Sequence, residues 1–123
     1  MSKLRLMKGL PVLLLVLAML VAFTGIGLAV TKSVKATSTN RWQPKHQYVQ
    51  KDGKIKWVNN TNRFHNIKST NIRKNWSYSR SLPAGSTRTR TFHKRGTYAY
   101  RCTIHSQLSN GACSGMCGFI HVL

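Results

Sequence analysis

Two histidines, a cysteine and a methionine in this 123-residue chain are spaced so that a fold could bring them together. Cys102 and His105 are separated by two residues, Met116 follows eleven residues after that histidine, and His65 lies 37 residues before the cysteine. A Cys-x-x-His pair at the end of a strand can point into one pocket from a tight turn, but folding has to supply the distant histidine. The spacing therefore predicts one metal site assembled from separate segments.

The types of donor atom indicate which metal would bind. One thiolate, two neutral imidazoles and a long, weak thioether contact are the ligands of mononuclear blue-copper electron-transfer sites. The three strong donors hold copper in a nearly trigonal plane that suits both Cu(I) and Cu(II), and the thioether tunes the reduction potential. We therefore expect one copper ion bound by His65, Cys102, His105 and Met116.

The segments around these residues have the pattern of β-strands. A run of aromatic and β-branched residues, 96–102, leads into the Cys-x-x-His pair, and residues 118–122 follow the methionine. In residues 54–58 the apolar Ile55 and Trp57 alternate with lysines, which places both in the core. Turn sequences rich in Gly, Asn and Pro separate these runs, and regular short strands of this kind predict an all-β sandwich.

Five segments together closely resemble the cupredoxins, the plastocyanin/azurin family of small copper proteins. The resemblance covers about residues 42–122, and implies a Greek-key β-sandwich in which the four residues named above bind one type 1 copper ion. It also implies that Asn66 and Thr103 hydrogen bond to lock the two ligand loops together, and that electrons pass through the exposed edge of His105. The matching segments are residues 54–59, 64–67, 82–85, 96–105 and 115–122.

The stretch before the methionine departs from the family pattern. Cupredoxins that share the Cys-x-x-His spacing usually leave only about two to four residues between that histidine and the methionine, whereas residues 106–115 intervene here. The same region holds two further cysteines, Cys113 and Cys117. If Cys102 binds the metal, these two remain as a pair. An exported protein offers the oxidising surroundings in which they could form a disulfide that staples the added loop.

Other interpretations of the cysteines stay open. Cys113, Cys117 and His121 have a Cys-x3-Cys-x3-His spacing that resembles the binuclear copper (CuA) loop of cytochrome oxidase subunit II, although a turn-like run precedes the first cysteine. Reduced cysteines would suit Cu(I) and favour a copper carrier or chaperone. A structural zinc site could combine all three cysteines with a histidine.

The first 30 residues predict a signal peptide or a membrane-anchor helix. Three basic residues precede an apolar run, 10–30, that contains no acid. This arrangement favours an inside amino terminus. It predicts that the copper domain, 42–123, is extracytoplasmic, either secreted or periplasmic, or tethered to the outer face of the cytoplasmic membrane. Residues 31–41, rich in Ser, Thr and Lys, are interpreted as a linker.

The charge balance restricts function and partners. Twenty Lys and Arg residues stand against a single acid, Asp52, for a formal net charge of +19. Such a field attracts acidic partners and weakens as salt rises, so we expect an acidic redox protein or an anionic surface. Export and the lack of a base-stacking motif argue against nucleic acid. One carboxylate excludes paired-acid hydrolysis and carboxylate-rich metal sites, so we expect an electron carrier rather than an enzyme.

Overall fold

The computed structural model describes residues 29–70 and 76–123. No helix among these residues is long and apolar enough to cross a membrane. The signal peptide or anchor predicted for residues 1–30 lies almost wholly outside the described ranges. Within those ranges the elements are β1 (Thr31–Ala36), β2 (Trp42–Gln43), β3 (His46–Val49), β4 (Lys54–Val58), β5 (His65–Ser69), β6 (Ser79–Leu82), β7 (Thr87–Thr91), β8 (Gly96–Ser109) and β9 (Ala112–Val122).

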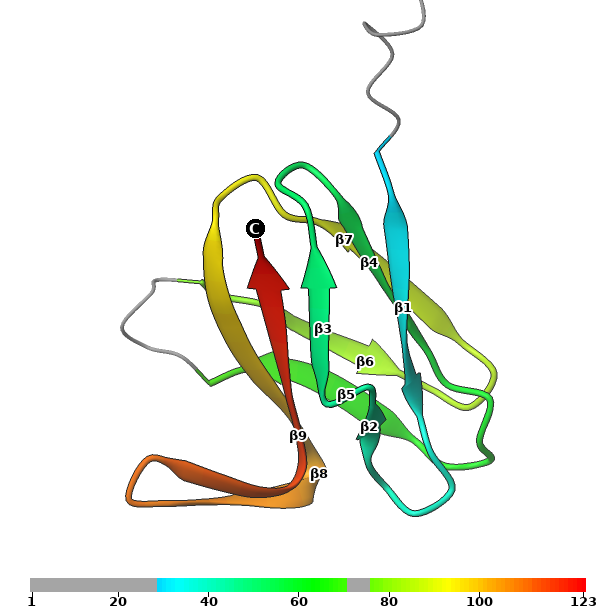
Figure 1. The fold of residues 1–123 in the computed structure, drawn as a ribbon. Coiled ribbons are helices and arrows are strands. Elements are labelled where there is room, and N and C mark those ends of the chain that lie inside the picture. The colour runs from blue at the N-terminus through cyan, green and yellow to red at the C-terminus, as the bar shows by residue number, and fades with distance from the viewer. Residues whose placement is uncertain (1–28, 71–75) are drawn as a thin grey trace, which may run out of the picture.

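The strands form two sheets that pack against each other (Figure 1). One sheet has the order β2-β1-β4-β7, and the other has the order β3-β9-β8-β5-β6. Strand β1 runs parallel to β4 and β3 runs parallel to β9, whereas the other pairs are antiparallel. The all-β sandwich predicted from the sequence is confirmed.

The prediction of a linker at residues 31–41 is wrong, because this segment begins with strand β1. β1 pairs with β4 along its length and with β2 at its end. Val34 and Ala36 are buried, while the Lys between them is exposed. Two apolar residues at alternate positions satisfy the strand period, but they do not stand out among Ser, Thr and Lys in the sequence. The folded domain therefore includes this segment.

The hydrophobic core lies between the two sheets. Ile55 and Trp57, which the sequence placed in the core, are fully buried on β4. Tyr100 faces them from β8, with its ring centroid 5.5 Å from that of Trp57. Gly118 pairs with Tyr100 on β9, and a Cβ at this glycine would lie 2.5 Å from the phenol oxygen. The tyrosine ring therefore occupies the space that any larger residue at position 118 would need.

One edge of the sandwich is covered by arginine. Arg90 on edge strand β7 pairs with the buried Ile55, so its side chain starts on the core-facing side of the sheet. Its guanidinium carbon lies 4.7 Å from the ring centre of Tyr78, 5.2 Å from that of Trp76 and 5.5 Å from that of Phe92. An inward-pointing charge on an edge strand discourages pairing with another chain. This arginine therefore shields the core and protects an exposed edge.

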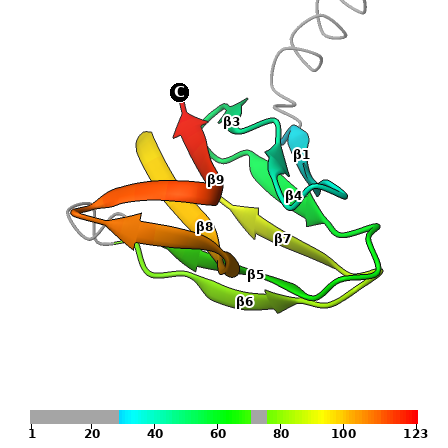
Figure 2. The ribbon, with the colours of Figure 1, turned by 90° about the horizontal axis from the view of Figure 1, so that it is seen from below.

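The long insert before Met116 is a regular extension of the β8–β9 hairpin. Ser106 pairs with Gly115, and the ladder continues from there to Ser109 opposite Ala112. Asn110 and Gly111 close it with φ angles of 51° and 78°, and positive φ at both central residues is typical of a two-residue type I′ turn. Figures 1 and 2 show this arm of the hairpin, in orange, turned away from the upper parts of β8 and β9.

Candidate metal centre

Two histidines and a cysteine converge where β5 begins and β8 bends. Nδ1 of His65 lies 3.1 Å from Nδ1 of His105, and Sγ of Cys102 lies 3.8 Å from the first nitrogen and 3.5 Å from the second. These three residues form one group whose ligand atoms all lie within 4.8 Å of one another. The structure thus brings together three of the four residues predicted as ligands.

The spacing of the three donor atoms suits a single ion. Nitrogen and sulfur atoms ~2.0–2.3 Å from one ion in a trigonal plane lie roughly 3.5–3.8 Å apart. The observed separations of 3.1, 3.5 and 3.8 Å are close to this range. His65 and Cys102 are fully buried, whereas His105 is partly exposed. The three residues therefore form a buried site in which only the His105 imidazole reaches the surface.

Met116 lies opposite this group despite the long insert. The register of β8 and β9 shifts between the pairs Arg101–Cys117 and Ser106–Gly115. Residues 102–105 therefore bulge out against a single residue, Met116, which is fully buried. A bulge of this kind aims side chains away from the ladder. Because the insert leaves and returns as a paired arm, it does not displace the methionine.

A buried asparagine organises the turn that precedes His65. Asn59 donates from Nδ2 to the carbonyl oxygens of Arg63 and Leu82, and its Oδ1 accepts from the hydroxyl of Thr61 at 2.6 Å. The Thr61 oxygen in turn lies 3.3 Å from Nε2 of His65. If the hydroxyl accepts the Nε2 hydrogen, Nδ1 is left with its lone pair toward the pocket, which is the tautomer a metal ligand needs. The sequence carries no sign of either role, because Asn and Thr are common in turns.

Asn66 and Thr103 join the two segments that carry the candidate ligands. Asn66 donates from Nδ2 to the Thr103 hydroxyl at 2.6 Å, and its Oδ1 accepts from the Thr103 backbone nitrogen at 2.7 Å. These two bonds lie next to His65 on one side and Cys102 on the other. They fix the spacing of those ligands before any metal arrives, in the place the family resemblance implied.

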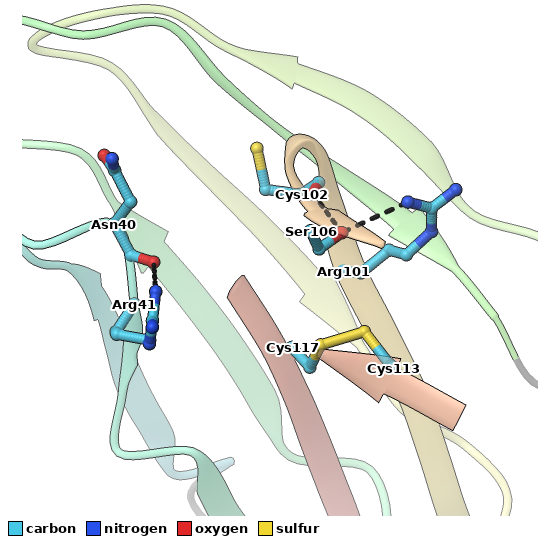
Figure 3. Close-up of a disulfide and its surroundings, with 7 residues drawn as sticks. All are labelled: Asn40, Arg41, Arg101, Cys102, Ser106, Cys113 and Cys117. Atoms are coloured by element: carbon cyan, nitrogen blue, oxygen red, sulfur yellow. Dashed lines mark hydrogen bonds between the residues drawn. A yellow bond between two sulfur atoms is a disulfide. The ribbon is translucent and has the colours of Figure 1, made fainter. Parts of the chain in front are cut away.

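Another hydrogen-bonded chain supports the bulge after Cys102. The Ser106 hydroxyl donates to the Cys102 carbonyl oxygen and accepts from the Arg101 guanidinium at 3.1 Å (Figure 3). This serine therefore ties the two ends of the segment that contains Cys102 and His105. The sequence carries no signal for its role, because a lone serine after a histidine is common on any surface.

The pKa of His65 is lowered from its usual 6.5, first by burial and then by the neighbouring positive charges of His105 and Arg63. A lower pKa keeps the imidazole neutral under mildly acidic conditions. Only the neutral form can offer a nitrogen lone pair to a metal. The environment of His65 therefore favours its ligand form.

The two remaining cysteines form a disulfide between Cys113 and Cys117 (Figure 3). Their Cα atoms are only 6.2 Å apart, although four residues of extended strand span roughly 13 Å. Gly115, with φ of 92°, supplies the bend between them, and a Cβ there would lie 2.4 Å from the His105 carbonyl oxygen. The disulfide thus holds the bend at which the arm leaves the sandwich.

This disulfide bears on the other interpretations of the cysteines. A binuclear copper loop needs Cys113 and Cys117 as thiolates, as do the zinc site and a Cu(I) carrier with extra sulfur ligands. Both sulfurs are already bonded to each other. His121, the third member of the binuclear pattern, pairs with Thr97 five residues before Cys102. In this structure Cys113 and Cys117 are therefore not free to act as ligands, whereas His65, Cys102 and His105 lie together.

The surface around His105 is hollowed and lined mostly by polar residues. A cavity of 300 Å³ is lined by His105 and by Ile104, Ser106 and Gly115 among others. Ile104 is 54% exposed, and Phe64, next to the other histidine in the chain, is 49% exposed. Single exposed apolar residues are normal on a protein surface, so these two alone do not define a contact surface. Of the two candidate histidine ligands, His105 is the one that reaches solvent.

No protein-family model and no curated protein matches this chain. Among solved structures, the copper-containing nitrite reductase NirK from Thermus scotoductus SA-01 is similar over 78% of this chain, at 24% identity and a TM-score of 0.62. This chain spans only 22% of the reductase. A reduced amicyanin mutant matches at 19% identity and a TM-score of 0.59, covering 77% of this chain and 82% of the amicyanin.

A purple cupredoxin from Nitrosopumilus maritimus is similar at 18% identity and a TM-score of 0.57, over 74% of this chain and 98% of that protein. At these identities the likeness establishes the fold. The chain therefore has the cupredoxin fold, as its sequence predicted, with His65, Cys102 and His105 as a ligand set that fits a type 1 copper site.

Proposed function

We propose that this protein is a small blue-copper protein that carries single electrons between redox partners. The observation that carries the proposal is the convergence of two Nδ1 atoms and one thiol sulfur in a buried pocket of the cupredoxin fold. His65, Cys102 and His105 would hold one copper ion, and Met116 would be the axial ligand. Bound copper would supply the Cu(I)/Cu(II) couple.

The surrounding residues support rapid electron transfer. The paired bonds of Asn66 and Thr103, and the bond of Thr61 to His65, fix the donors in place independently of the oxidation state. A rigid ligand set limits the reorganisation that accompanies transfer. His105 is the partly exposed ligand, so we propose its edge as the route for electrons. With one carboxylate in the chain, we propose a carrier rather than an enzyme.

The test is metal analysis with a visible spectrum. Oxidised protein should bind one copper per chain and show the intense blue colour of a copper–thiolate bond. Cys102→Ser should lose that colour, while Ser79→Ala, a control at an exposed position on strand β6, should keep it. A copper-loaded protein whose colour survives Cys102→Ser would contradict the proposal, and a colourless protein that binds only Cu(I) would support a carrier of the ion itself.

We propose an extracytoplasmic location and an anionic partner. A disulfide persists in oxidising compartments, which supports export, and the apolar run at residues 10–30 supports a signal or a membrane tether. Residues 36–123 hold 15 Lys and Arg against one acid, so the domain is strongly cationic. Arg80 and Arg90 line a cavity of 650 Å³ between β6 and β7, which could receive carboxylates of an acidic redox protein. We propose no nucleic-acid partner, because an exported protein does not meet one.

A further inference from the structure

A second pair of histidines lies on the edge of the five-stranded sheet. Nδ1 of His46 on β3 is 2.9 Å from Nε2 of His121 on β9. These strands run parallel, with His46 opposite Phe119 and Tyr48 opposite His121, so the two imidazoles are diagonal neighbours on one face. The pair plays no part in the candidate copper centre.

The separation of the two nitrogens suits coordination of one ion at a right angle. Two nitrogens each ~2.0–2.1 Å from a metal lie roughly 2.9 Å apart when the angle between them is about 90°. Right-angled nitrogen donors are typical of the tetragonal sites that Cu(II) and Ni(II) prefer. The observed 2.9 Å equals this value, and it differs from the wider spacing of a tetrahedral site.

The surroundings hold both rings in position for this role. Nδ1 of His121 lies 3.1 Å from the hydroxyl of Thr97, and a hydrogen on Nδ1 bonded to that oxygen leaves Nε2 free to bind metal. The His46 ring stacks on Phe119 with centroids 4.8 Å apart, and Tyr48 stacks on His121 at 4.6 Å. Residues from three strands therefore orient two adjacent nitrogen donors.

We propose that His46 and His121 form a second, open metal site for Cu(II) or Ni(II), with water or an exogenous ligand in the remaining positions. Thr97, the partner of His121 in the ladder, lies five residues before Cys102 on β8. At ~3.3 Å per residue the two sites are roughly 16 Å apart along that strand. The second site is thus independent of the ligands of the first.

The charge of the protein makes a distinctive prediction for this site. A cation approaching a domain with 15 basic residues and one acid is repelled. Salt screens that repulsion, so affinity for the ion should increase as ionic strength rises. Adventitious binding to surface carboxylates would weaken with salt instead.

The experiment is a calorimetric titration of Ni(II) into full-length protein that already holds one equivalent of copper. One Ni(II) should bind, and His46→Ala and His121→Gln should each weaken binding at least about tenfold, while Thr97→Val should weaken it by about tenfold. His93→Ala is the control, because His93 is a surface histidine paired with Asp52 at 2.9 Å, and it should leave binding unchanged. His46→Ala and His121→Gln should also remove the additional axial electron paramagnetic resonance signal that a second equivalent of Cu(II) gives in place of Ni(II).

Two results would overturn this site: no nickel binding by the intact protein, which would mean that the two rings merely share a hydrogen bond, or binding that survives both histidine variants. His46 is exposed, so His46→Ala should fold normally, which a thermal melt will check. Failure of the first site would look different. The blue colour would be missing from the intact protein while nickel binding still depended on His46.

Discussion

The His65 imidazole is also held on the side that faces away from the metal pocket. Its Nε2 faces Thr61, whose hydroxyl is itself held by the buried Asn59. Thr61→Val removes the oxygen that orients this imidazole while keeping the shape of the side chain. We expect copper affinity to fall about 10–100-fold, as measured by competition with a chelator of known affinity. Thr89→Val on the exposed side of β7 is the control, and an equal loss in both variants would contradict a specific role for Thr61.

Met116 offers the clearest test of an axial ligand. It is fully buried opposite residues 102–105, so Met116→Leu should keep copper and the blue colour because the three strong donors remain. The reduction potential should rise, since replacing a weak axial donor with an apolar side chain disfavours Cu(II) relative to Cu(I). Voltammetry of both proteins measures this change. An unaltered potential would remove Met116 from the ligand set.

The candidate ligands could be predicted from residue types, spacing and the family resemblance, which also indicated Asn66 and Thr103, but the supporting roles of Asn59, Thr61 and Ser106 could not. Cys102, His105 and Met116 stand out because of their spacing between two strand-like segments. Asn59 and Ser106 act through backbone carbonyls of residues that are distant or ordinary in the sequence. Such bonds depend on where the backbone passes in the folded protein, and no spacing rule encodes that.

The disulfide and the bend it closes form a separate structural unit. Replacing both Cys113 and Cys117 with alanine should lower the free energy of unfolding by about 2 kcal/mol, the chain-entropy value for so short a loop. Denaturant titration measures the loss. The blue spectrum should persist, because neither sulfur is a ligand in the mononuclear site. Loss of copper from the double variant at an unchanged fold would revive the interpretations that use these sulfurs.

The strands differ in how well the alternation of apolar and polar residues predicts them. β4 alternates Lys with Ile55 and Trp57, so its core face could be predicted. β1 has only Val34 and Ala36 on its buried face, and β1 is recognised only once it lies beside β4. The paired arm at residues 106–115 was missed for a different reason. Its Asn110-Gly111 turn is a strong hairpin signal, but the added length was interpreted as a loop.

The near absence of acids sets how the whole protein responds to pH. Carboxylates usually dominate acid denaturation, and this chain has only Asp52. The pKa of His121 is lowered, first by burial and then by the charge of His46, and the pKa of His65 is lowered as well. The unfolded chain therefore binds protons more readily than the native state. The contribution of these two histidines to the free energy of unfolding is fully present above pH 6.5. It is lost as the pH falls through their lowered pKa values.

Denaturant titrations of the metal-free protein at pH 7.5 and 5.5 will measure this loss. His121→Gln should reduce the difference in unfolding free energy between the two conditions, because the side chain no longer titrates. His93→Ala is a suitable control on the surface. A wild-type protein equally stable at both pH values would contradict the lowered pKa values.

The formal charge of +19 should govern encounter rates. Reduction of the oxidised protein by ferrocyanide, an anion, should slow as salt rises from about 10 to 150 mM, because screening weakens long-range attraction. Oxidation of the reduced protein by a cationic cobalt or ruthenium complex should accelerate over the same range. Stopped-flow absorbance at the blue band follows both reactions. Identical salt dependence for the two reagents would mean that the charge does not act at the site of transfer.

The length of the arm closed by Asn110 and Gly111 can change only in fixed steps. Antiparallel ladders alternate hydrogen-bonded and open pairs, and a two-residue turn requires the same kind of pair beside it. One extra residue in each half would place the wrong pair there, whereas two in each half restore it. Relatives that keep a two-residue turn should therefore differ in arm length by multiples of four. An odd change would require a bulge or a longer turn within the arm.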